Sequence, residues 1–224
     1  MACNYLGSHF QMPIIINQTN PCRDMFGGQL SNGQYTANNQ RYQNSDAYAI
    51  DYNSSSISYN LNNPNSFRND ILVCILESPH CDEYLINTNT RWGHAAMGQT
   101  GKLFDKKFYN MLSQNHGNIA IGTYDVVLLN SVQFQCSNGL CPLNKTVRDG
   151  NWNSMINNNK VYDDLLRRIE SLNPHYIINL CTKGNINLQL ILHAKLLADN
   201  VLQGTHFTHG WHPSSWYNPN ANIY

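Results

Sequence analysis

The run ILVCILE at residues 71–77 is the stretch that decides the fold. All of its residues before the final glutamate are apolar, and several of them are β-branched. A continuous apolar run of this length predicts a strand that is buried on both faces, which is typical of a parallel sheet covered by helices.

Comparable apolar runs follow this strand, with helical segments between them. Strands are predicted at 124–132 (YDVVLLNSV), at 175–181 (HYIINLC) and at 205–210 (THFTHG). Apolar residues at helical spacing predict helices at 101–112, 161–173 and 184–197. Such alternation favours an α/β protein with three layers, α/β/α, around a central, mostly parallel four-stranded sheet.

The chain is predicted to be one domain with an extension. Residues 1–65 are polar and rich in Tyr, Asn, Ser and Gln, so we expect an N-terminal extension packed on a domain of residues 66–224. Only 12% of the residues are charged and the net charge is +0, so any contact with nucleic acid must be local.

The cysteine pattern and the hydropathy indicate a cytoplasmic protein without a membrane span. Seven cysteines are present, and we find neither a secretory signal nor an apolar run of transmembrane length. Cys136 and Cys141 lack the spacing of a zinc pair, so we expect no metal and no cofactor.

Unusual polar residues follow each predicted strand. They are Glu77-Ser78-Pro79-His80, Asn130, Cys181-Thr182-Lys183 and His212-Pro213-Ser214. Because ligands of parallel α/β sheets bind at the carboxyl ends of the strands, these groups should converge on one cleft. Asp82 and Glu83 are interpreted as a solvated turn.

Four segments resemble, in order, motifs of the uracil-DNA glycosylase superfamily. They are ILESPH (75–80), MGQTGKLFDKKF (97–108), VVLLNSV (126–132) and HPSSW (212–216). The resemblance implies an enzyme that flips a pyrimidine out of DNA and hydrolyses its bond to the sugar. It covers roughly residues 71–217 and implies that the protein acts on DNA as a monomer.

The resemblance and the chemistry imply the same roles. Glu77 and His212 are the expected catalytic pair: a carboxylate to steady a sugar cation and a donor for the leaving base. Asn130, His80 and Ala96 are expected to contact the base. Ser78, Ser214 and Lys183 are expected to contact DNA, and Trp216 with Tyr217 to fill the space left by the flipped base. Each of these residue types, taken alone, is more often structural.

Departures from the family pattern point to an unusual base. Ser78 stands where many relatives carry a catalytic Asp or Asn, His80 where uracil-selective enzymes carry a Tyr, and Ala96 where relatives of the iron–sulfur branch carry a stacking Phe. The four cysteines of that branch are not reproduced. We therefore expect a bulky 5-substituted cytosine such as glucosyl-hydroxymethylcytosine, removed in anti-phage defence to leave abasic sites. The alternatives are uracil excision in repair and a non-catalytic DNA-binding module.

Overall fold

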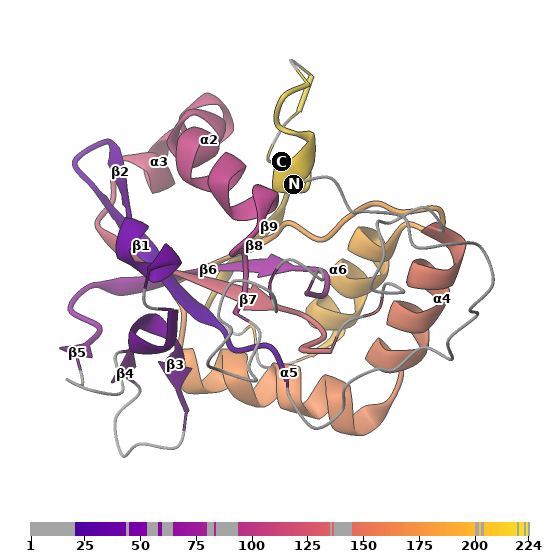
Figure 1. The fold of residues 1–224 in the computed structure, drawn as a ribbon. Coiled ribbons are helices and arrows are strands. Elements are labelled where there is room, and N and C mark those ends of the chain that lie inside the picture. Colours follow the sequence, from indigo (N-terminus) through magenta and orange to yellow (C-terminus); the bar gives the residue numbers. More distant parts are fainter. Residues whose placement is uncertain are drawn as a thin grey trace.

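The computed structural model describes residues 21–43, 45–52, 58–59, 65–79, 83, 94–134, 136, 145–199, 202, 204–218, 220–221 and 223. Its main sheet has six strands in the order β2-β1-β7-β6-β8-β9 (Figure 1). The strands are β1 (Met25–Ser31), β2 (Gln34–Ala37), β6 (Asp70–Leu76), β7 (Tyr124–Asn130), β8 (Tyr176–Asn179) and β9 (His206–His209).

The four predicted strands form the parallel part of this sheet. β7, β6, β8 and β9 are neighbours and all run in the same direction. The expected order of strands and helices is confirmed, and so is the α/β class with helices on both faces.

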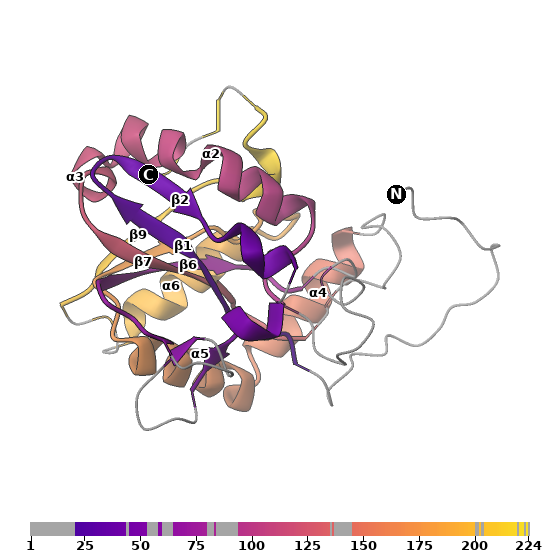
Figure 2. The same cartoon turned by 60° about the vertical axis from the view of Figure 1, so that its left-hand side comes forward.

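The prediction of four strands is wrong, because the N-terminal segment adds a hairpin. β1 pairs antiparallel with β7, and β2 pairs antiparallel with β1 (Figure 2). The connection is Asn32-Gly33, whose φ angles of 50° and 72° suit a two-residue hairpin turn. The hairpin covers the edge of β7 that four strands alone would leave open.

Helices cover both faces of the sheet. α2 (Gln99–Asn115) and the short α3 (Gly117–Ala120) lie on one side. On the other side are α4 (Lys145–Ile156), α5 (Asn159–Leu172) and α6 (Leu188–Ala198). The helices expected at 101–112, 161–173 and 184–197 are confirmed as α2, α5 and α6, and α4 is an additional helix.

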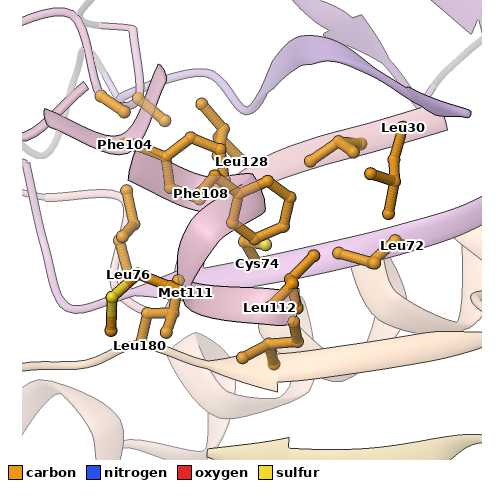
Figure 3. Packing of buried hydrophobic residues seen from close by; sticks show 14 of the residues in the cluster. Leu30, Leu72, Cys74, Leu76, Phe104, Phe108, Met111, Leu112, Leu128 and Leu180 are labelled. Atoms are coloured by element: carbon orange, nitrogen blue, oxygen red, sulfur yellow. The ribbon is translucent and has the colours of Figure 1, made fainter. Parts of the chain in front are cut away.

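The sheet separates two hydrophobic cores. On one face, alternate residues of β6 meet the apolar side chains of α2 (Figure 3). The residues that meet there are Leu72, Cys74, Leu76, Phe104, Phe108, Met111 and Leu112. Val73 and Ile75 point the other way and pack with α4, α5 and α6. Burial on both faces explains why the run at 71–77 contains no polar residue before its end.

A second, small antiparallel sheet lies outside the main one. It consists of β3 (Ile50–Asp51), β4 (Ser58–Tyr59) and β5 (Asn65–Ser66). Short 3-10 helices also occur at Asn39–Tyr42, Ser45–Tyr48 and Pro213–Ser215. In the part of the chain that the structure describes, no helix has both the length and the apolar character needed to cross a bilayer.

Candidate active site

A cavity of about 250 Å³ opens at the carboxyl ends of β6 and β7. Its lining brings together polar residues from distant parts of the sequence. The described lining residues are Leu76, Glu77, Ser78, Pro79, Glu83, Gly98, Gln99, Thr100, Asn130, Arg148, Thr182, His212 and Ser214. The expected convergence of Glu77, Asn130 and His212 on one cleft is therefore present.

A larger hollow of about 520 Å³ lies at the opposite ends of the strands, next to the first residues of β8 and β9. Its described lining residues are His116, Gly117, Ile119, Tyr176, His206, Phe207 and Thr208. None of these is a carboxylate, whereas the smaller cavity brings Glu77 and Glu83 together with His212. The smaller cavity is therefore the better candidate for acid–base chemistry.

Glu77 directly follows β6 and is held through its main chain. Its carbonyl oxygen accepts hydrogen bonds from the Val132 amide at 3.1 Å, the Trp152 indole at 3.2 Å and the Ser131 hydroxyl. Its side chain is 7% exposed, and Arg148 Nε lies 3.2 Å from its Oε1 atom. These contacts place a nearly buried carboxylate at the cavity wall.

Burial raises the pKa of the Glu77 carboxyl from 4.5 to about 7. The guanidinium of Arg148 and a hydrogen bond with Thr182 oppose this rise, while the neighbouring Asp149 adds to it. The carboxyl group therefore exchanges its proton near neutral pH, where a general base is most useful.

Asn130 is the last residue of β7, and buried charges hold its main chain. Its carbonyl accepts two hydrogen bonds from the Arg168 guanidinium, each 3.1 Å long, and its amide donates to Asp24 at 3.3 Å. Arg168 and Asp24 are themselves ion-paired at 2.8 Å. The side-chain Nδ2 of Asn130 lies 3.4 Å from both Glu83 Oε2 and Cys22 Sγ.

His212 comes shortly after β9 and begins a 3-10 turn at Pro213–Ser215. Its Nδ1 atom accepts a hydrogen bond from the Ser214 amide at 3.3 Å and lies 2.7 Å from the Ser214 hydroxyl. Since Nδ1 accepts from this amide, the neutral ring carries its proton on Nε2. Burial and, secondarily, the charge of Arg148 lower the His212 pKa to about 4. The ring is thus a neutral donor at physiological pH.

Of the other residues expected to contact the base or DNA, some line the cavity and others do not. Ser78 and Ser214 line the cavity, and their expected contact with DNA stays a prediction. Lys183 is exposed but is not among the described lining residues. Tyr217 is 75% exposed. His80 lies outside the described residues.

The expectation that Trp216 enters the DNA stack is wrong. The side chain is 2% exposed and packs parallel to Phe104 and Phe108, with ring centroids 5.7 and 6.4 Å away. Its indole nitrogen donates to the Trp211 carbonyl at 2.7 Å. Trp216 therefore belongs to the core beneath α2, and Tyr217 is the aromatic side chain that the turn presents to solvent.

Ala96, which was expected to leave open space in the pocket, is instead buried and contacts Glu83. It is fully buried in the core beside α2 and is not among the described lining residues. Its backbone amide donates to Glu83 Oε1 at 3.0 Å, and its φ of 55° is unusual for a residue other than glycine. The expected enlargement of the pocket by a missing phenyl ring therefore finds no support in the placement of Ala96.

Two charged residues that line the cavity were not identified from the sequence. Glu83 was assigned to a solvated turn, yet it is 6% exposed and lines the cavity. Arg148, on α4, contacts Glu77 and also bonds Asp149 at 2.6 Å. Neither residue lies at the end of a predicted strand, so the strand-end rule could not select them.

Neither the models of known protein families nor the curated proteins contain a match for this chain. A function must therefore come from the chemistry of the cavity itself.

Proposed function

We propose that the protein is a monofunctional DNA glycosylase that excises a modified pyrimidine from DNA. The observation that supports this most strongly is the meeting of Glu77, Asn130 and His212 at the carboxyl ends of parallel strands. A carboxylate, a base-reading amide and a neutral histidine are the groups that hydrolysis of an N-glycosidic bond requires.

In the proposed reaction, the bond between C1′ of the sugar and N1 of the base breaks first. The electron pair of this bond goes to the base, and a cation develops on the sugar. The Nε2–H of His212 donates to the base oxygen as it becomes negative. Glu77, as a carboxylate, steadies the cation and takes a proton from the water whose oxygen bonds to C1′. The base leaves as an anion and takes up a proton, Glu77 gives up the proton that it took from water, and the products are the free base and an abasic site.

The exposed residues of the last turn suit contact with the strand. Ser214 lies at the mouth of the cavity and is exposed, so its hydroxyl is accessible to a phosphate oxygen. Tyr217 projects from the same segment and replaces Trp216 as the candidate for filling the gap left by a flipped base.

As the base we propose a bulky 5-substituted cytosine such as glucosyl-hydroxymethylcytosine, excised as a defence against phage. The reason for proposing a base with a bulky 5-substituent is His80, which stands where uracil-selective enzymes carry a Tyr.

The test is base release from synthetic DNA. Duplex and single-stranded oligonucleotides would carry uracil, 5-hydroxymethylcytosine or its glucosylated form at one position, and alkaline cleavage would reveal abasic sites. We expect strand cleavage at the glucosylated base with the wild-type protein and a loss of at least about 10²-fold with Glu77→Gln. Cleavage at uracil alone would support repair, and no cleavage on any substrate would refute a glycosylase.

A further inference from the structure

The cavity contains a second carboxylate, Glu83, that the proposed reaction does not use. Contacts from at least three described neighbours help to hold its carboxylate in place. The Ala96 amide donates to Oε1 at 3.0 Å, the Asn130 amide nitrogen lies 3.4 Å from Oε2, and the Cys22 thiol lies 3.7 Å from the same oxygen. Burying a carboxylate is unfavourable unless such donors surround it, so its position next to Asn130 is structurally defined.

Glu83 determines which way the Asn130 side chain faces. Because a carboxylate oxygen only accepts hydrogen bonds, the amide nitrogen of Asn130 must point toward Glu83. The Oδ1 atom of Asn130 then remains as an acceptor. It is buried, and among the described residues it has no hydrogen-bond partner. A buried acceptor without a partner is destabilising, and a ligand with an N–H group in the cavity would satisfy it.

Asn130 alone does not distinguish the pyrimidines. Its Oδ1 could accept from N3–H of a 4-oxo base such as uracil or from the 4-amino group of cytosine. Glu83 would distinguish the two bases. A carboxylate and the O4 atom of a 4-oxo base are both hydrogen-bond acceptors, so placing them next to each other is unfavourable. A 4-amino group instead has two N–H donors, one for each acceptor.

We propose that Glu83 and Asn130 form an acceptor pair that selects a pyrimidine with a 4-amino group over its 4-oxo counterpart. The inference rests on the proposed glycosylase function and names the class of base that the same cavity takes. It assigns Glu83 a role in specificity, separate from the chemistry of Glu77 and His212.

The experiment compares two duplexes that differ only at position 4 of one base. One carries 5-hydroxymethylcytosine and the other 5-hydroxymethyluracil, so the 5-substituent is the same. Fluorescence anisotropy gives the dissociation constants of the full-length protein, and single-turnover assays give the rates of base release. We expect the wild type to favour the 4-amino base by roughly 10- to 100-fold, the scale of a hydrogen bond to a charged group.

The variant is Glu83→Gln, which keeps the size of the side chain and introduces an amide donor. The preference should then fall to about one or reverse, since a glutamine can turn its NH₂ toward O4. Glu170→Gln, at an exposed position on α5, is the matched control and should keep the wild-type preference. Thermal unfolding would verify that both variants fold.

The outcomes separate this inference from the proposed function. Base release with no preference, or with a preference for the 4-oxo base in the wild type, would overturn the role of Glu83 and leave the glycosylase standing. The wild-type ratio alone decides this even if Glu83→Gln does not fold. No release of either base, with a binding preference that Glu83→Gln abolishes, would overturn catalysis and support the acceptor pair. Neither release nor a binding preference would overturn both.

Discussion

Replacing Glu77 by Gln should stabilise the folded protein at pH 8 and leave its stability near pH 4 almost unchanged. The pKa of this carboxyl rises from 4.5 to about 7 on folding, mainly because the side chain is buried. A raised pKa means that the folded state prefers the protonated form. The contribution of Glu77 to stability is therefore complete below pH 4.5 and is lost as the pH rises through 7.

The magnitude follows from the size of this change. At about 1.36 kcal/mol for each pH unit, the ionised carboxylate costs the folded state about 3 kcal/mol above pH 7. Glu77→Gln removes the titration, while Arg148 keeps its ion pair with Asp149 at 2.6 Å. The melting temperature at pH 8 should rise by about 6–12 °C, because 1 kcal/mol corresponds to about 2–4 °C in a chain of this size.

The assay is urea unfolding between pH 4.5 and 8.5, followed by tryptophan fluorescence. The difference in free energy of unfolding between Glu77→Gln and the wild type should grow by about 3 kcal/mol across this range. Glu170→Gln serves as the control and should give a curve parallel to the wild type. A constant difference for Glu77→Gln across the whole range would refute the raised pKa, and with it the assignment of Glu77 as a base that titrates near neutrality.

Other perturbations test further parts of the site. Base release by the wild type should increase as the pH rises through about 7, because Glu77 acts as a carboxylate, and a single-turnover profile that is flat from pH 5 to 9 would contradict this. Arg148→Met should move that rise to higher pH, since Arg148 lowers the pKa of Glu77. His212→Ala should slow base release by about 10²- to 10³-fold in the same assay, the usual loss for one donor to a developing anion. Trp216→Ala should cost about 3–5 kcal/mol in urea unfolding, as expected for a buried aromatic. Tyr217→Ala should leave unfolding unchanged but slow release from duplex DNA more than from single strands, and equal losses on both would exclude a wedge.

Most of the parallel sheet could be predicted because burial on both faces leaves a continuous apolar signal. The strands expected at 71–77 and 124–132 are found at Asp70–Leu76 and Tyr124–Asn130. The strand-end rule also brought Glu77, Asn130 and His212 to one cavity, since parallel strands place their carboxyl ends on one edge.

The remainder depends on contacts that no local pattern specifies. β1 contains Gly27-Gly28 and shifts register next to them, so its alternation is interrupted, although Asn32-Gly33 was a usable hairpin signal. α4 is dominated by polar residues, and its burial of Trp152 follows from tertiary packing. The environment of the Glu83 carboxylate is equally difficult to predict, because Ala96, Asn130 and Cys22, which contact it, lie 13 to 61 positions away in the sequence.

The ion pair between Arg168 and Asp24 should affect how the protein unfolds. Both side chains are buried, and together they hold the end of β7, while Tyr52 donates to Asp24 at 2.7 Å. Loss of the segment that carries Asp24 would remove the buried counter-charge of this guanidinium and leave it only Asp164, a more exposed carboxylate 2.8 Å from its Nε atom, which should destabilise the interior. The hairpin, the small sheet and β7 should therefore unfold in one cooperative event. Deleting the N-terminal region that carries Asp24 would therefore also remove a hydrogen bond that supports the main chain of Asn130.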